Sequence, residues 1–155
     1  MPQTLISKNA AEFELKNQEG KTVKPMSLKG NRILLSFHPL AWTPVCEIQM
    51  RTLEIKKDEL DHLDTLAYGI SVDAVPTKQA WAESIGIKET NLLSDFMPRG
   101  AVAKMYDLFS EEHGFSKRAN ILLDPQRKIE LIKIYDIPEI PDIEEIIRYI
   151  QSRKP

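Results

Sequence analysis

Two short and almost unbroken apolar runs constrain what this chain can fold into. They are RILLSF at residues 32–37 and LAYGISV at residues 66–72. A strand covered on both faces has this pattern, because neither set of alternating side chains meets water. Between the runs, residues 44–64 instead predict a helix. The apolar stripe of that helix consists of Cys46, Met50, Leu53, Leu60 and Leu63.

The rest of the chain continues this alternation of strands and helices. The expected elements are a hairpin at 12–23 that turns near Gly20, a helix at 77–87 with Thr77 as its N-cap, a strand at 91–95, a short helix at 101–109, strands at 119–123 and 128–134 around the turn 124–127, and a last helix with the stripe Ile143, Ile146, Ile147 and Ile150. This order predicts an α/β fold with a central mixed β-sheet flanked by helices and an N-terminal β-hairpin.

The length of 155 residues suits a single domain, 1–155, and 42% apolar residues can fill one core. The formal net charge is only -2 and no basic block stands out, so nucleic acid is not an expected partner. No stretch is as long as a membrane span, and the first residues do not predict a secretory signal. One cysteine and three histidines without metal-ligand spacing predict no metal site, and the cytoplasm is the expected location.

The only cysteine, Cys46, lies where the first of these helices is expected to begin. Pro39 and Pro44 stiffen the turn before it, and Thr43 offers a hydroxyl group three residues upstream. In the first turn of a helix, unpaired N–H groups and the helix dipole stabilise a thiolate over a thiol. A lone cysteine is more often a small core residue. A core cysteine needs no such turn before it, however, so the pattern favours a nucleophile.

The stretch PLAWTPVC at residues 39–46 resembles the Pro-x-x-x-Thr-x-x-Cys active-site motif of the peroxiredoxins, the AhpC/TSA family. The resemblance continues in register over nearly the whole chain. The other similar segments are AAEFELKNQEGKTV at 10–23, ISVD at 70–73 with Ala80 and Trp81 after it, LLSDF at 92–96, and RANILLDPQRKI at 118–129. The resemblance implies a thioredoxin-like fold.

The same resemblance implies a thiol-dependent peroxidase that reduces hydrogen peroxide or organic hydroperoxides without a metal or organic cofactor. The Cys46 thiolate would attack the peroxide and become a sulfenic acid. Arg118 would lie over the sulfur, where its permanent charge favours the thiolate. The implied catalytic residues are Pro39, Thr43, Cys46 and Arg118. The implied substrate-binding residues are Thr43, Val45, Gln49 and Arg118.

The absence of a second cysteine predicts how the catalytic cycle closes. A sulfenic acid on Cys46 has no other thiol in its own chain, which indicates a peroxiredoxin of the one-cysteine type. Its reductant would be an external thiol: thioredoxin, glutaredoxin or a low-molecular-weight thiol. The resemblance further implies a homodimer.

Three residues depart from the family pattern around the motif. His38 replaces an aromatic residue, Glu47 a threonine, and Gln49 a glutamate. Gln49 can hydrogen-bond the arginine but brings no charge. Glu47 would face solvent or oppose thiolate formation. His38 is expected to be a packed imidazole with a satisfied hydrogen bond rather than a catalytic base.

Two other functions remain open from the residues. Thr43 and Cys46 have the spacing of a Cys-x-x-Cys site whose first cysteine is missing, as in a thiol–disulfide oxidoreductase, although dithiol exchange needs both sulfurs. A non-enzymatic redox sensor or holdase is the other alternative, because a fold alone does not determine function.

Overall fold

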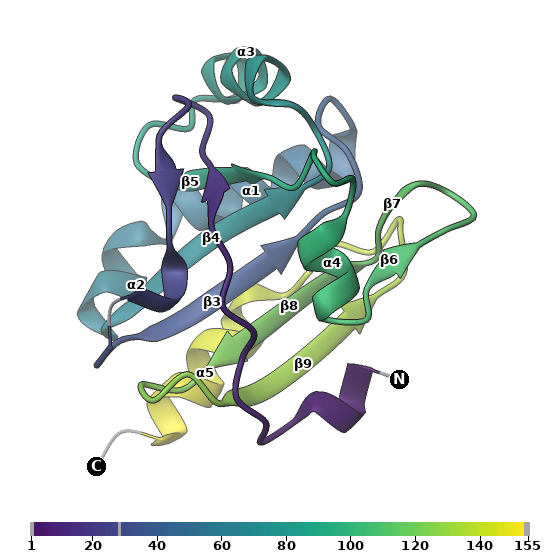
Figure 1. Ribbon diagram of the computed structural model, residues 1–155. Helices are drawn as coiled ribbons and strands as arrows, with labels where there is room; N and C mark the ends of the chain where they lie inside the picture. The colour runs from purple at the N-terminus through teal and green to yellow at the C-terminus, as the bar shows by residue number, and fades with distance from the viewer. Residues whose placement is uncertain (1, 28, 154–155) are drawn as a thin grey trace.

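The structure, a computed structural model, describes residues 2–27 and 29–153 and is built around a seven-stranded sheet (Figure 1). The strands are β1 (Leu15–Lys16), β2 (Thr22–Val23), β3 (Arg32–Phe37), β4 (Thr65–Ser71), β5 (Asn91–Ser94), β8 (Arg118–Leu123) and β9 (Ile129–Tyr135). Their spatial order is β2-β1-β5-β4-β3-β8-β9. The pairs β3–β4 and β4–β5 are parallel, whereas β3–β8 and β8–β9 are antiparallel, so the predicted mixed sheet is confirmed.

Helices cover both faces of the sheet. They are α1 (Pro44–Ile55), α2 (Lys57–His62), α3 (Val75–Ile85), α4 (Ala101–Met105) and α5 (Ile143–Arg153), with short 3-10 turns η1 (Pro2–Leu5) and η2 (Pro25–Ser27). In Figure 1, α1, α2 and α5 lie behind the sheet and α4 lies in front of it. The predicted α/β architecture with flanking helices is therefore confirmed.

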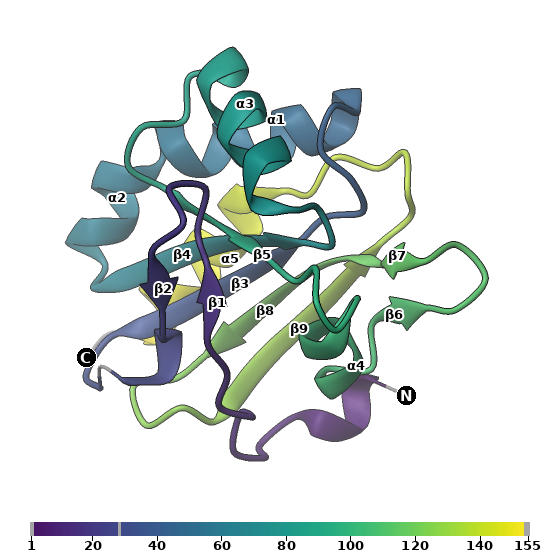
Figure 2. The same cartoon turned by 45° about the horizontal axis from the view of Figure 1, so that its top comes forward.

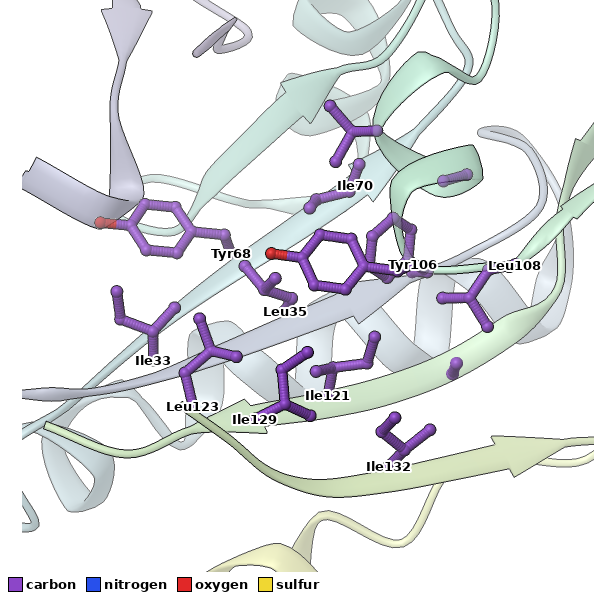
Figure 3. Close-up of a cluster of buried hydrophobic side chains, with 14 of the residues drawn as sticks. Ile33, Leu35, Tyr68, Ile70, Tyr106, Leu108, Ile121, Leu123, Ile129 and Ile132 are labelled. Carbon is purple, nitrogen blue, oxygen red and sulfur yellow. The ribbon is translucent and has the colours of Figure 1, made fainter. Parts of the chain in front are cut away.

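Two apolar cores separate the layers, and β3 supplies side chains to both. Ile33 and Leu35 point into the core under α4, together with Tyr68 of β4 (Figure 3). Phe37 belongs to the same core. Leu34 points to the opposite core, which α1, α2, α3 and α5 cover. A strand presents alternate residues to opposite faces, so an unbroken apolar run is what a strand between two cores requires.

The same alternation places polar residues beneath α1. Ser36 follows Leu34 by two residues and lies on the α1 face of β3. In β8, Ala119 and Ile121 belong to the core under α4, whereas Leu122 belongs to the other core. Arg118 lies four positions before Leu122 in the same strand, so the side chains of both residues leave the sheet on the α1 face.

The predicted N-terminal hairpin is also confirmed. Leu15 pairs with Val23 and Lys16 with Thr22, and the turn between them contains Gly20 with a φ of 79°. Strand β1 pairs in antiparallel fashion with β5, so the hairpin extends the sheet at that edge. Figure 2 shows the two strands of the hairpin side by side.

The prediction that Thr77 caps the second helix is wrong. Helix α3 begins two residues earlier, with Ala74 as the N-cap and Pro76 in the first turn. N–H groups in the first turn of a helix have no acceptor within the helix. Proline suits this position because it has no N–H group. The first helical bond runs from the Lys78 N–H to the Ala74 carbonyl, at 3.0 Å.

Two other helical segments are shorter than the sequence predicts. The expected helix at 44–64 divides at Lys56 into α1 and α2. The expected helix at 101–109 ends at Met105, because Asp107 has a φ of 57° and turns the chain. The residues beyond form a small hairpin, β6 (Phe109–Ser110) and β7 (Phe115–Ser116), which was not predicted.

The carboxylate of Glu54 anchors the end of α1 to the loop before β5. It accepts hydrogen bonds from the N–H of Lys88 at 2.8 Å and from the N–H and hydroxyl of Thr90 at 2.9 and 2.8 Å. Partial burial raises the pKa of Glu54, but these bonds and that of the Glu89 N–H outweigh it and hold the pKa below its ordinary value. One carboxylate thus orients the helix whose other end carries Cys46.

Replacing this anchor is expected to destabilise the fold in a pH-dependent way. Glu54→Gln should lower the free energy of unfolding by about 1–2 kcal/mol at pH 7, because hydrogen bonds to a charged acceptor are lost. The folded-state pKa is lowered, so the difference should be complete above the unfolded pKa and disappear as pH falls through the folded one. Urea unfolding at several pH values measures this.

The matched control is Glu59→Gln, since Glu59 forms an exposed pair with Lys56 at 3.3 Å. That change should stay within about 0.5 kcal/mol of the original protein. Equal losses in the two variants would contradict the anchoring role of Glu54.

Candidate active site

A tight turn joins the end of β3 to the start of α1. Trp42 within it has a φ of 68°, which a bulky residue rarely adopts. Such a conformation persists only where the surroundings hold it. Here the Thr43 hydroxyl donates to the Leu40 carbonyl at 2.8 Å, and the Ala41 N–H donates to Asp73 Oδ2 at 2.8 Å. The turn is therefore fixed both internally and from the loop after β4.

Helix α1 begins where the sequence predicts. Thr43 is the N-cap and Pro44 is the first helical residue, so Cys46 lies in the first turn. The N–H groups of Val45 and Cys46 lack an intrahelical acceptor at these positions. Cys46 is a free cysteine and is buried. The expected helix start around the thiol is confirmed.

Arg118, the first residue of β8, reaches the sulfur from across the sheet. Its Nη1 lies 3.3 Å from Cys46 Sγ, although the two residues are 72 positions apart in the sequence. Its Nε and Nη2 both donate to the Ile137 carbonyl, at 2.9 and 2.6 Å. The guanidinium group is buried and carries its charge at any physiological pH.

Gln49 holds the same guanidinium from the helix side. Its Oε1 accepts from Arg118 Nη1 at 2.8 Å, while its Nε2 donates to Ser36 Oγ at 2.8 Å and to the Phe37 carbonyl at 3.1 Å. All three polar contacts are buried, so Gln49 orients the arginine without adding a negative charge. The described residues place no carboxylate within hydrogen-bond distance of Arg118.

The other two departures from the family pattern have separate outcomes. Glu47 is partly exposed and pairs with Arg51 at 3.3 Å, so its carboxylate faces solvent. His38 is buried and packs against Trp81 with ring centroids 5.5 Å apart. A backbone group of Ser36 interacts with the ring, but neither ring nitrogen forms a hydrogen bond of good geometry in the part of the chain that the structure describes, so the expectation of a satisfied hydrogen bond is not confirmed.

Burial, together with the charge of Lys78, holds the pKa of His38 well below its ordinary value. The ring is therefore neutral at pH 7. Burial of this ring therefore does not bury a charge.

The structure thus brings Thr43, Val45, Cys46, Gln49 and Arg118 together around one sulfur. Pro39, also buried, lies at the start of the turn that carries Thr43. The Thr43 hydroxyl directs its proton to the Leu40 carbonyl, which leaves its oxygen as an acceptor.

Sequence reasoning missed the polar group beneath the turn, which consists of Ser71, Asp73 and Lys78. The spacing of apolar residues in helix α3 did indicate that Lys78 is buried. It shares a face with Trp81, Ala82 and Ile85, all of which are buried. A lysine on an apolar helical stripe is unusual, because a buried ammonium group costs free energy unless a partner compensates for it.

Comparison with known proteins identifies the family. A model of the AhpC/TSA family matches residues 6–132. The chain belongs to that family. Alkyl hydroperoxide reductase E of Mycobacterium tuberculosis is 32% identical over 138 residues, which cover 88% of this chain and 90% of the relative. Peroxiredoxin-1 of Gekko japonicus is 26% identical, over 95% of this chain and 78% of its own length.

Solved structures agree with this assignment. AhpC of Enterococcus faecalis superposes with a TM-score of 0.86 at 25% identity, covering 96% of this chain and 91% of that one. The predicted thioredoxin-like fold and the resemblance to peroxiredoxins are confirmed. As a family member with one cysteine, the protein is an oxidoreductase, a thiol-dependent peroxidase. Within residues 2–27 and 29–153, no helix has the length and apolar character needed to span a membrane.

The contact between Arg118 and Cys46 predicts the effect of removing the guanidinium. Arg118→Ala should lower the thiolate fraction of Cys46 at pH 7 and slow its oxidation by hydrogen peroxide by about 100-fold, since a charged donor is lost at the reacting sulfur. Ultraviolet thiolate absorbance and stopped-flow tryptophan fluorescence measure the two effects.

Arg51→Ala is the matched control, because Arg51 is an exposed arginine on α1 that pairs with Glu47. It should change the oxidation rate less than about twofold, as expected for a screened surface charge. An equal effect of the two variants would exclude a specific role of Arg118.

Proposed function

We propose that the protein reduces hydroperoxides at Cys46 and that an external thiol reduces the sulfenic acid formed there. The observation that carries this proposal is the 3.3 Å contact between Arg118 Nη1 and Cys46 Sγ in the first turn of α1. A permanent positive charge and an open helix N-terminus both favour a thiolate, which is the reactive form of cysteine. The proposal treats residues 1–155 as one peroxiredoxin domain.

The reaction balances with the groups present. The Cys46 thiolate attacks the near oxygen of ROOH, so a sulfur–oxygen bond forms while the oxygen–oxygen bond breaks. The sulfur is oxidised to sulfenic acid, and the departing oxygen takes up a proton and leaves as water or an alcohol. Negative charge grows on that oxygen in the transition state, and Arg118 and the N–H groups of Val45 and Cys46 stabilise it.

The remaining residues orient these groups. Gln49 fixes the guanidinium, and the Thr43 oxygen accepts a hydrogen bond from the peroxide O–H because its own proton is engaged with Leu40. Pro39 forms one wall of the site. Because Cys46 has no exposed surface, the peroxide reaches the sulfur only after a small movement of the groups that cover it.

The single thiol supports the second half of the cycle. Thioredoxin, glutaredoxin or a low-molecular-weight thiol attacks the sulfenic acid, forms a mixed disulfide and releases water. A second thiol then reduces that disulfide. A cycle of this kind needs a reducing compartment, so the cytoplasm and an antioxidant role are part of the proposal.

Replacing the nucleophile tests the proposal directly. Cys46→Ser should fold normally by circular dichroism, yet its peroxide consumption in the presence of dithiothreitol should fall to the uncatalysed background. The reason is that a serine hydroxyl is not ionised at pH 7 and cannot take over the attack. Peroxide consumption above background in this variant would reject Cys46 as the nucleophile.

The original protein provides the control for the external thiol. Without a thiol, intact-mass spectrometry should show one added oxygen and then two or three, since nothing in the chain intercepts the sulfenic acid. With glutathione present, a glutathione adduct should form instead. Oxidation without catalytic turnover under any thiol would favour a sensor, and a disulfide-linked dimer as main product would replace the external-thiol cycle.

The proposal includes a homodimer that forms around the active site. Apolar side chains are exposed on the segments that build this site: Trp42 in the turn is 57% exposed, Ile48 in α1 42%, and Ile137, whose carbonyl holds Arg118, 47%. A second copy of the chain would cover these residues. Large aromatic side chains are the ones most enriched at the centre of such interfaces.

Sedimentation tests this assembly. The original protein should sediment as a dimer at micromolar concentration, and Trp42→Asp should raise the dimer dissociation constant at least about tenfold by placing a charge in the interface. Met105→Asp is the control, because Met105 is comparably exposed on α4, across the sheet from α1. A monomeric original protein would contradict the proposal.

A further inference from the structure

Helix α3 carries a lysine that is completely buried. Lys78 has no exposed surface, and its Nζ donates to Ser71 Oγ at 2.5 Å. In the described part of the chain, no carboxylate lies within ion-pair distance of this ammonium group. A buried charge costs several kcal/mol unless other charges or hydrogen bonds compensate for it. The surroundings of Lys78 therefore have to account for its position.

The groups that face Lys78 come from four different segments. Burial lowers the pKa of Lys78 to about 8, while the charges of Asp73, Cys46 and Asp95 act in the opposite direction and raise it. His38 lies on the remaining side and is neutral, since burial and Lys78 itself hold its pKa low. With a pKa of about 8, most Lys78 side chains remain charged at pH 7.

A chain of hydrogen bonds leads from Lys78 to the active-site turn. Ser71 Oγ accepts from Lys78 and donates to Asp73 Oδ2 at 2.6 Å. The same Asp73 oxygen accepts the Ala41 N–H at 2.8 Å, in the turn that precedes Cys46. Lys78 is thus held by its contacts in a defined place beneath the site.

The charges around the sulfur are unbalanced without a thiolate. Arg118 is a buried cation whose partners are the neutral Gln49 amide and the Ile137 carbonyl. Lys78 is a second buried cation whose hydrogen bond goes to a neutral hydroxyl. Asp73 partly compensates for Lys78 through Ser71. The other anion that raises the pKa of Lys78 from the site itself is ionised Cys46.

We propose that Lys78 is a positioning residue for peroxide reduction: its buried ammonium group, held by Ser71, is a second cation that stabilises the Cys46 thiolate. It acts through Cys46 and touches neither peroxide nor the leaving oxygen. This inference rests on the proposed function, because the thiolate matters only if Cys46 reduces peroxides. Its tests measure the ionisation of the thiol and need no peroxide.

The coupling is reciprocal, because each charge must stabilise the other by the same free energy. Oxidation of Cys46 to an uncharged sulfenic acid removes the anion and should lower the pKa of Lys78 further. Above the pKa of Lys78 its charge is gone, and its effect on the thiolate disappears as well.

The first test removes the charge and keeps the length of the side chain. In Lys78→Met, the midpoint of thiolate absorbance against pH should move up by about one unit, and alkylation of Cys46 by iodoacetamide should slow about tenfold when both proteins are compared at a pH below the midpoint of the original protein. Lys21→Met is the matched control, since Lys21 is 74% exposed in the N-terminal hairpin. That variant should behave like the original protein. Equal alkylation rates in Lys78→Met and the original protein would overturn the proposal.

A second measurement needs no change at Lys78, which matters if Lys78→Met does not fold. In protein with ¹³C-labelled lysine, one side-chain signal should titrate near pH 8, well below the ordinary lysine range above about 10. Cys46→Ser should shift the midpoint of that signal to lower pH, because the thiolate is absent. A lysine that only supports the fold would not respond. An unchanged midpoint overturns the proposal even where peroxide turnover is intact, and a shifted midpoint supports it even where turnover is absent.

Discussion

The guanidinium group of Arg118 is buried and permanently charged, and its hydrogen bonds tie together parts of the chain that share no local sequence. Two of its nitrogens are held by the Ile137 carbonyl, beyond the end of β9. The third reaches Gln49 and Cys46 in α1. A charge without enough donors and acceptors around it would be costly at this depth. The placement of α1 on the sheet is therefore constrained by the hydrogen bonds that Arg118 requires as well as by apolar packing.

This constraint explains how the site reconciles burial with reactivity. The thiol of Cys46 is out of contact with water, which by itself opposes ionisation. Arg118 and the first turn of α1 act against that cost. Gln49 satisfies the arginine without neutralising it, so the positive charge remains available to the sulfur. A carboxylate in place of Gln49 could accept from the guanidinium, but it would oppose a negative charge on Cys46 and could not donate to the Phe37 carbonyl as Gln49 does.

The turn before α1 depends on a second set of contacts. Trp42 adopts a backbone conformation that is unfavourable for a bulky residue, and Asp73 and Thr43 provide the bonds that keep the turn in this form. Ser71 and Lys78 support Asp73 from below. Asp73, Ser71 and Lys78 thus support the conformation of the turn and also contribute charge near the sulfur.

The sequence by itself determined the local elements and the chemistry of the nucleophile. Unbroken apolar runs predicted β3 and β4. Pro44 after Thr43 predicted a helix start that places Cys46 in the first turn. Both signals could be recognised because they act over only a few residues. The lone cysteine likewise indicated an external reductant. Local signals gave the wrong helix boundary where a turn interrupts a helical apolar pattern, as at Asp107, and at the start of α3.

Only the tertiary structure decided which groups surround the sulfur. The resemblance to a family pointed to Arg118, but the residues alone did not distinguish it from other arginines, since its contact with Cys46 spans 72 positions and depends on the register of β8 against β3. The position of Lys78 on the apolar stripe of α3 indicated burial, but only the packing of α3 into the core decided that Ser71 is its partner. Long-range electrostatic partners follow from how strands and helices meet, and a linear pattern does not contain that information.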